Sequence, residues 1–227
     1  MSTVHMSTVV FVTVVRHHAS DAELALAPVN GEALLTHTVR GLLALPDLDL
    51  VVVAAPERCA HLFSAALSSI GKHSSLDRHS SFDKRCRIVP GPSLKHAFDT
   101  VAKEIAENPV ILVHDALRAF TPADTVRAVA NAVRAGSPFV VPVLPMADTV
   151  KVTNAAKVIT GTEDRAYLRT AQTPLGFTRE TFLSYADKPS LDGAHTIAGH
   201  PDAMRVTTSF EQKLAEAIAV AGKEDVL

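Results

Sequence analysis

The stretch that decides the fold class is Val110–Arg118, VILVHDALR. Its first four residues are all apolar and β-favouring, which is typical of a strand that helices cover on both faces of a parallel sheet. Comparable apolar runs occur at Val9–Val15 (VVFVTVV), Leu50–Ala55 (LVVVAA) and Phe139–Leu144 (FVVPVL). These runs predict the inner strands of one sheet.

Segments with helical periodicity separate the apolar runs. Apolar residues recur at helical spacing over 34–43, 59–70, 94–105 and 126–133. Alternation of buried strands with amphipathic helices predicts an α/β fold, in which helices flank a mostly parallel sheet. On the second of these helices, Cys59 falls on the apolar face and is expected to be a core thiol.

Several local signals predict element boundaries. Thr121 is expected to be the N-cap of a helix that ends at Gly136. Ser209 and Gln212 are expected to form a capping box for the C-terminal helix. We also expect a last short strand at Met204–Thr207 and a surface loop at residues 71–85.

The segment Asp148–Thr162 departs from the alternating pattern. Two short runs flank Asn154, and they are too polar for the centre of a sheet. They predict a β-hairpin arm that protrudes from the domain. We therefore expect one domain over residues 8–222, including the arm at 148–162, and a disordered N-terminus at residues 1–7.

Composition limits the function classes. The 227 residues are 47% hydrophobic with a net charge of -2, which suits a packed core and disfavours nucleic acid as a partner. No apolar run reaches the roughly 18 residues that span a bilayer, and no signal peptide opens the chain, so no membrane partner is expected. Two cysteines are too few for a disulfide framework, which favours a cytoplasmic location.

Candidate chemistry lies where strands end, because ligands of open parallel sheets bind outside the carboxyl ends of the strands. Asp115 follows the VILV run closely, and Arg118 comes three residues later. The carboxylate can hold a divalent metal that carries a nucleotide phosphate, and the guanidinium can steady the anion. The alternative is a structural Asp–Arg pair at the end of the strand.

Four motifs in order are more specific than any one of them. They are VHDALR at Val113–Arg118, PVLPMADTVK at Pro142–Lys151, GTEDRAYLRTAQTP at Gly161–Pro174, and RVT at Arg205–Thr207. In this order the chain resembles the 2-C-methyl-D-erythritol 4-phosphate cytidylyltransferase family of the non-mevalonate isoprenoid pathway. The resemblance covers nearly the whole chain and implies a Rossmann-like nucleotide-binding sheet.

The resemblance also implies an activity. Enzymes of this family transfer CMP from CTP to 2-C-methyl-D-erythritol 4-phosphate with Mg²⁺ and release pyrophosphate. Such a transfer depends mainly on cations that neutralise phosphate charge and on groups that aim the nucleophile. The family resemblance further implies a homodimer, interlocked through the arm at 148–162.

Site residues follow from the same resemblance. Asp115 would lie beside the metal and the nucleotide ribose or substrate, with Arg118 nearby. Thr149 and Arg165, on the arm of one subunit, would hold the substrate phosphate of the other. Arg205 stands where the family usually has a Lys that positions that phosphate, so the charge is kept but a planar fork replaces a point charge.

Two segments depart from the family pattern. The family's first strand is followed by a Gly-rich turn, P-A-A-G-x-G-x-R and then P-K, whose amides cradle the triphosphate. The corresponding Arg16–Pro28 (RHHASDAELALAP) contains no Gly, and Leu24 stands in the place of the Lys. Arg16 is the candidate for a substitute cation, against the alternative of a solvated polar turn. In the base-reading loop, Pro92 replaces a Gly and Phe98 replaces a Ser.

The sequence is compatible with three functions, of which two are enzymatic and one is not. The first is the cytidylyltransferase that the resemblance implies. The second is a catalytically impaired family member that acts as a dimeric binding or regulatory protein. The third is a nucleotidyltransferase with a changed nucleotide or sugar-phosphate specificity.

Overall fold

The computed structural model describes residues 6–14, 20–70 and 83–224, and the side chains of 222–224 are left out. Its centre is an eight-stranded sheet in the order β10-β7-β11-β6-β1-β4-β5, with β12 paired to β7. The strands are β1 (Thr8–Thr13), β4 (Leu50–Ala55), β5 (Cys86–Pro90), β6 (Val110–Asp115), β7 (Phe139–Pro145), β10 (Arg169–Ala171), β11 (Leu175–Phe177) and β12 (His195–Ala198).

Most strand pairs that surround β1 are parallel, as the apolar runs predict. β1 pairs in parallel with β4 and β6, β4 with β5, and β7 with β12. β11 lies antiparallel between β6 and β7, and β10 lies antiparallel to β7. The carboxyl ends of β1 and β6 therefore meet at one edge of the sheet.

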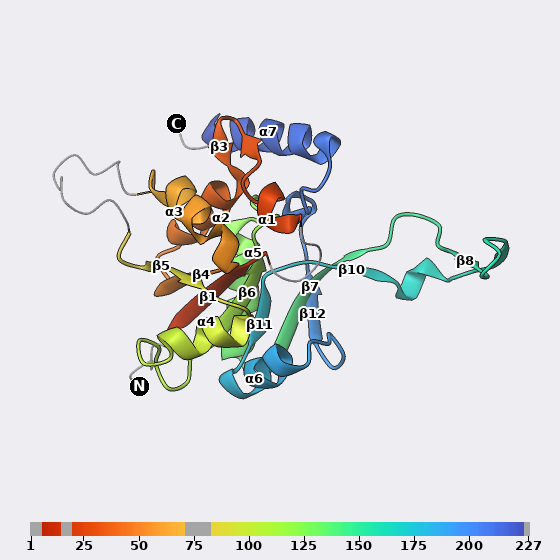
Figure 1. Cartoon of the computed structure of the whole chain (residues 1–227). Helices are drawn as coiled ribbons and strands as arrows, with labels where there is room; N and C mark the ends of the chain where they lie inside the picture. Colours follow the sequence, from red (N-terminus) through yellow and green to blue (C-terminus); the bar gives the residue numbers. More distant parts are fainter. Residues whose placement is uncertain (1–5, 15–19, 71–82, 225–227) are drawn as a thin grey trace.

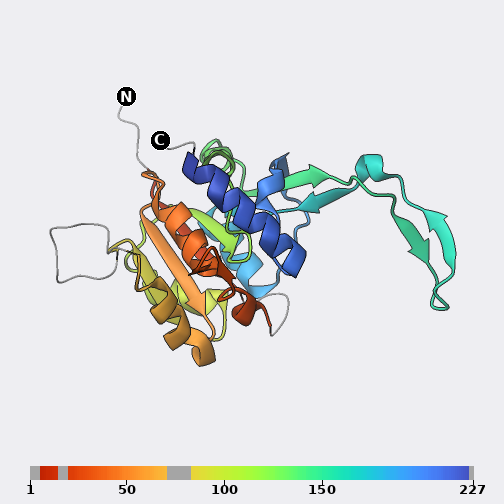
Figure 2. The ribbon, with the colours of Figure 1, turned by 90° about the horizontal axis from the view of Figure 1, so that it is seen from above.

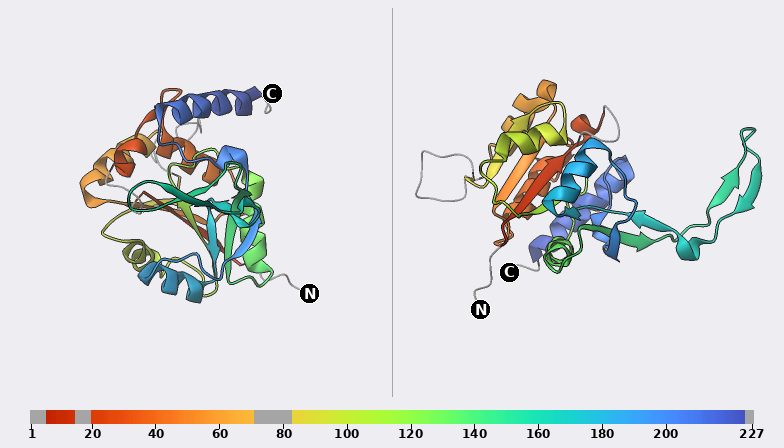
Figure 3. Two further views of the ribbon diagram at one scale, coloured as in Figure 1. Left: turned by 90° about the vertical axis from the view of Figure 1, so that its right-hand side faces the viewer. Right: turned by 90° about the horizontal axis from the view of Figure 1, so that it is seen from below.

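Helices cover both faces of the sheet (Figure 1; Figure 3, left). They are α2 (Leu34–Leu43), α3 (Ala60–Leu67), α4 (Leu94–Val101), α5 (Ala123–Arg134), α6 (Arg179–Asp187) and α7 (Ser209–Glu224). Along β1, Val10 and Val12 pack in the core under α2, α3 and α5, whereas Val9 and Phe11 pack in the core on the side of α4 and α6. Cys59 is buried in the first of these cores, as expected of a core thiol.

Short elements complete the chain. The hairpin of β2 (Pro28–Val29) and β3 (Glu32–Ala33) contacts α7 through Asn30, whose Nδ2 donates to the carbonyl of Glu216 at 2.9 Å. α1 (Asp21–Leu24) follows residues 15–19, which contain Arg16 and lie outside the described part of the chain. The 3₁₀ helices are η1 (Glu57–Cys59), η2 (Arg165–Tyr167) and η3 (Pro201–Ala203).

Two of the boundary predictions are wrong by one residue. α5 takes Pro122 as its N-cap, and the Thr121 hydroxyl instead donates to the carbonyl of Arg118 at 2.9 Å. The box at the start of α7 is formed by Thr208 and Glu211, which exchange hydrogen bonds of 3.2 and 2.8 Å. At α7, Thr208 is as good a cap by type as Ser209, a choice that sequence spacing leaves open. At α5, Pro122 stands at the N-cap through its extended backbone and makes no side-chain cap hydrogen bond.

The predicted strand at Met204–Thr207 is also wrong. Its one backbone bond to a distant described segment is that of the Val206 amide, at 2.8 Å from the carbonyl of Leu117, so this stretch is not a strand. The last strand is β12, which pairs with β7. Its residues His195–Ala198 (HTIA) are mostly exposed and include only two apolar residues, so it lacked the continuous apolar run that identified the inner strands.

The predicted hairpin is confirmed. β8 (Lys151–Thr153) pairs antiparallel with β9 (Ile159–Thr162), and the turn between them places Lys157 at φ 61°. The hairpin extends far from the sheet and its helices (Figure 2). Val158 and Ile159 expose 58% and 61% of their surface there, so the arm presents apolar side chains to solvent.

Within the described ranges, no helix is long and apolar enough to cross a membrane.

Candidate functional site

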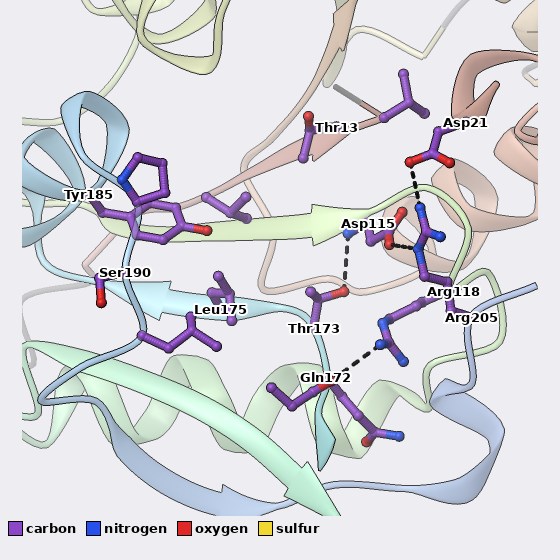
Figure 4. A pocket seen from close by; sticks show the side chains of 15 residues that line it. Thr13, Asp21, Asp115, Arg118, Gln172, Thr173, Leu175, Tyr185, Ser190 and Arg205 are labelled. Carbon is purple, nitrogen blue, oxygen red and sulfur yellow. Dashed lines mark hydrogen bonds and ion pairs between the residues drawn. The ribbon is translucent and has the colours of Figure 1, made fainter. Parts of the chain in front are cut away.

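A cavity of about 430 Å³ opens at the carboxyl ends of β1 and β6. This is the edge at which the rule for open sheets places a ligand. Figure 4 shows the polar side chains that converge on it from segments far apart in the sequence. The lining residues with polar side chains are Thr13, Asp21, Asp115, Arg118, Gln172, Thr173, Tyr185, Ser190 and Arg205.

Asp115 is the last residue of β6 and its side chain faces the cavity. Its Oδ1 accepts the amide of Leu117 at 3.0 Å, and its Oδ2 accepts Nε of Arg205 at 2.7 Å. Because a carboxylate offers about four lone-pair sites, both oxygens keep acceptor capacity toward the cavity. The acid that the sequence predicted at the end of this strand therefore lines the cavity, and its role in holding a metal stays a prediction.

Arg205 lies between two carboxylates. Its Nε donates to Asp115, and its Nη2 donates to Oδ2 of Asp21 at 2.6 Å. Burial disfavours the charged guanidinium, but the hydrogen bonds and charges of the two carboxylates outweigh that effect and raise the pKa of Arg205. Arg205 thus stays a cation at the cavity wall.

Arg118 has a different environment from the one expected. Its Nη1 donates to the carbonyl of Ala203 at 2.5 Å, and its Nη2 donates to the carbonyl of Ala171 at 3.2 Å. Burial lowers the pKa of Arg118, although the guanidinium remains cationic near neutral pH. The hydrogen-bonded cation of Asp115 is therefore Arg205, while Arg118 joins β10 to η3 beside the cavity.

His114 and Thr173 form a hydrogen-bonded chain behind Asp115. Nε2 of His114 lies 3.2 Å from the carbonyl of Arg118, which can only accept, so Nε2 carries the proton. Nδ1 then accepts the hydroxyl of Thr173 at 3.0 Å, and the same hydroxyl oxygen accepts the Asp115 amide at 3.0 Å. Every polar atom in this series of hydrogen bonds has a partner only while His114 is neutral.

The neutral, buried His114 predicts that the free energy of unfolding depends on pH. Burial lowers the pKa of His114 to about 4, whereas a histidine in the unfolded chain titrates near 6.5. Between these values the unfolded state holds a proton that the folded state does not, so the free energy of unfolding falls as the pH falls. The loss from this residue is expected to reach about 3 kcal/mol between pH 7 and pH 4.

His114→Gln removes the titrating group and is expected to flatten that pH dependence relative to the wild type. Urea unfolding of both proteins at pH 7, 5.5 and 4 measures the difference. His61→Gln is the matched control, since His61 is exposed on α3 and its loss leaves the buried chain intact. Equal slopes for His114→Gln and the wild type would contradict the neutral buried histidine.

The predicted arm residues are not near this cavity in their own chain. Thr149 and Arg165 are exposed on the segment that carries the hairpin, and Nη1 of Arg165 donates to the carbonyl of Ala147 at 2.6 Å. Neither lines the cavity. Arg16 falls outside the described residues, so its predicted role as a substitute cation stays a prediction.

Sequence reasoning did not assign a site role to six of the nine polar residues of the wall, and three of them, Thr173, Asp21 and Gln172, make key contacts. Thr173 lies in the TAQTP motif, but nothing in the motif indicated that its hydroxyl binds the Asp115 amide. Asp21 lies in a segment without periodicity, and no local signal indicated that it is buried. Gln172 was quoted only as part of the motif, and it ties β10 to η3 through bonds of 2.8 and 2.9 Å with the backbone of His200.

The donor set suits a metal that arrives with its ligand. Within the described ranges, no group of three or more His, Cys, Asp or Glu side chains converges on a point that suits a metal ion. Mg²⁺ is often bound through one or two carboxylates together with substrate phosphates, and it keeps several waters. Asp115, with free acceptor capacity at the cavity, fits that pattern.

Comparisons with known proteins agree on one family. Residues 15–221 match the family model described as 2-C-methyl-D-erythritol 4-phosphate cytidylyltransferase. A relative of that name from Saccharopolyspora erythraea is 39% identical over 212 residues, which cover 86% of this chain and 89% of the relative. Another, from Nocardia farcinica, is 36% identical over 209 residues, covering 86% and 84%.

Solved structures agree with the fold. The crystal structure of 4-diphosphocytidyl-2C-methyl-D-erythritol synthase from Anaerococcus prevotii aligns with a TM-score of 0.70 at 17% identity, covering 95% of this chain and 96% of that chain. A further structure of a synthase with that name aligns with a TM-score of 0.71 at 18% identity, covering 94% and 99%. These likenesses support the Rossmann-like sheet that the motifs predicted.

Proposed function

The chain belongs to the 2-C-methyl-D-erythritol 4-phosphate cytidylyltransferase family, and we propose that it transfers CMP from CTP to 2-C-methyl-D-erythritol 4-phosphate in isoprenoid precursor biosynthesis. The observation that carries the proposal is the cavity at the ends of β1 and β6. It gathers Asp115 and Arg118 from one family motif and Arg205 from another, far apart in the sequence, at the ligand-binding edge of the sheet.

The reaction depends more on neutralising the negative charge of the phosphates than on a covalent enzyme intermediate. A phosphate oxygen of the acceptor bonds to the α-phosphorus of CTP, the bond to the bridging oxygen of the β-phosphate breaks, and pyrophosphate leaves. Mg²⁺, when bound with CTP, supplies charge neutralisation for the triphosphate. In this proposal Asp115 would hold that ion, and Arg205, which is hydrogen-bonded to Asp115, would attract the phosphate of the acceptor.

We assign the remaining positions to a homodimer. Thr149 and Arg165 lie on an arm that extends away from the cavity of its own chain, and that arm carries exposed apolar side chains. An arm of this shape suits insertion into a second copy, where Arg165 of the partner subunit supplies a further cation for the substrate phosphate. The proposed working unit is therefore two chains with two composite sites.

The proposal predicts pyrophosphate release. Purified protein with CTP, Mg²⁺ and 2-C-methyl-D-erythritol 4-phosphate is expected to release pyrophosphate well above the rate of the same mixture without protein. Omission of the acceptor or of Mg²⁺ provides the controls. Because the Arg16–Pro28 segment has no Gly, the assay also tests whether the chain works without the family's phosphate loop. Release that never exceeds the blank would reject the proposal.

Neither the family match nor the named relatives favour an impaired regulatory protein or a changed specificity. Both described cysteines, Cys59 and Cys86, are free and buried, which fits the reducing cytoplasm where we propose that the enzyme works.

A further inference from the structure

Asp21 is a buried acid at the cavity that no family motif predicted. It is the first residue of α1 and exposes 1% of its surface. Its Oδ2 accepts Nη2 of Arg205 at 2.6 Å, across 184 positions of sequence. A buried carboxylate is costly unless a cation and hydrogen bonds compensate it, so this contact is part of a built arrangement and not a surface ion pair.

The contact uses the shape of the arginine. Arg205 donates from Nε to Asp115 and from Nη2 to Asp21, and Figure 4 shows its guanidinium between the two carboxylates. Because the guanidinium is planar and rigid, two carboxylates on different nitrogens determine its orientation. An ammonium group on a flexible stem has no such preferred plane.

The same contact affects the charge that a substrate meets. Asp21 and Asp115 carry two negative charges at the cavity, and Arg205 and Arg118 carry two positive ones. Arg118 directs its donors to the carbonyls of Ala171 and Ala203. The charge of Asp21 therefore weakens the attraction of Arg205 for an incoming phosphate while it holds the guanidinium in place.

We propose that Asp21 is a positioning residue of this site, which orients Arg205 for the acceptor phosphate and lowers the affinity for that phosphate in doing so. The inference rests on the proposed function for the identity of the substrate. Asp21 belongs to the Gly-free segment after β1, where the sequence indicated only the loss of the family's Lys. The proposal gives this segment a role, because Asp21 acts on the substrate through Arg205.

The test is Asp21→Asn, which keeps the shape and an acceptor but removes the charge. The KM for 2-C-methyl-D-erythritol 4-phosphate is expected to fall about fivefold, because one repelling charge is gone, and kcat is expected to fall about tenfold, because a neutral amide holds the plane of Arg205 less firmly than a carboxylate does. Glu23→Gln, an exposed acid of the same helix, is the matched control and leaves both constants unchanged. Unchanged KM and kcat in Asp21→Asn would overturn the proposal.

A second measurement does not depend on turnover. In ¹⁵N-labelled protein, the Nε–H signal of Arg205, assigned by its loss in Arg205→Lys, is titrated with inorganic phosphate. Asp21→Asn is expected to shift that signal without ligand and to respond at a several-fold lower phosphate concentration than the wild type. An identical signal and titration in both proteins overturns the role of Asp21. A wild type that releases no pyrophosphate but shows the expected titration rejects the proposed function alone.

Discussion

Replacing Asp115 with Asn is expected to lower kcat/KM for cytidylyl transfer by about 10²- to 10³-fold, the usual effect of losing one charge-stabilising group. The carboxylate is the acceptor for Nε of Arg205 at 2.7 Å and the candidate ligand of the metal that accompanies CTP. An amide has half the acceptor capacity, and one of its two orientations turns an N–H toward the Arg205 donor. A single atom change therefore removes a charge and disturbs the neighbouring cation.

Steady-state rates of pyrophosphate release, with both substrates varied, measure this effect. Asp124→Asn provides the control, because Asp124 is a fully solvated acid in the first turn of α5 whose ion pair with Arg127 lies on the surface. Thermal unfolding of both variants separates loss of activity from loss of fold. An Asp115→Asn variant that is folded and retains more than about a tenth of wild-type kcat/KM would place the chemistry elsewhere.

Mixing two inactive variants is expected to restore activity if the arm serves the other subunit. Arg165→Ala removes the arm cation and Asp115→Asn damages the cavity, so each homodimer has two defective sites. In a mixed dimer both defects fall in the same composite site and the other site is intact. Random mixing makes about half of the dimers mixed, each with one working site, so about a quarter of wild-type activity is expected.

The control for this experiment is a mixture of Asp115→Asn with Arg205→Ala. These two residues are hydrogen-bonded in one cavity of one chain, so a mixed dimer has one defect in each site and no site is intact. No recovery is expected from that pair. Equal recovery, or equal absence of recovery, in both mixtures argues against an arm that completes the site of its partner. An affinity tag on one variant of each mixture, with co-purification of the untagged variant, confirms that dimers have exchanged.

Some of the site was readable from the sequence because its signals are local. Runs such as VVFVTVV and VILV predict strands with two covered faces, and the sheet rule then places Asp115, at the end of the second run, at a ligand-binding edge. The polar alternation around Asn154 likewise predicted the hairpin. Boundaries were less accurate, since Thr208 and Ser209 are equally good caps by type and only the backbone geometry selects one.

The sequence by itself determined the four apolar inner strands and the helices that alternate with them, the position of Asp115 and the existence of the arm, because residue spacing dictates which side chains share a face. Only the tertiary structure decided which side chains meet in the cavity. Asp21 and Arg205 are 184 positions apart, and the Thr173 hydroxyl bonds to the Asp115 amide across 58. Such contacts depend on how the sheet brings separate segments together. Local periodicity carries no information about which residues far apart in the sequence lie close together in space.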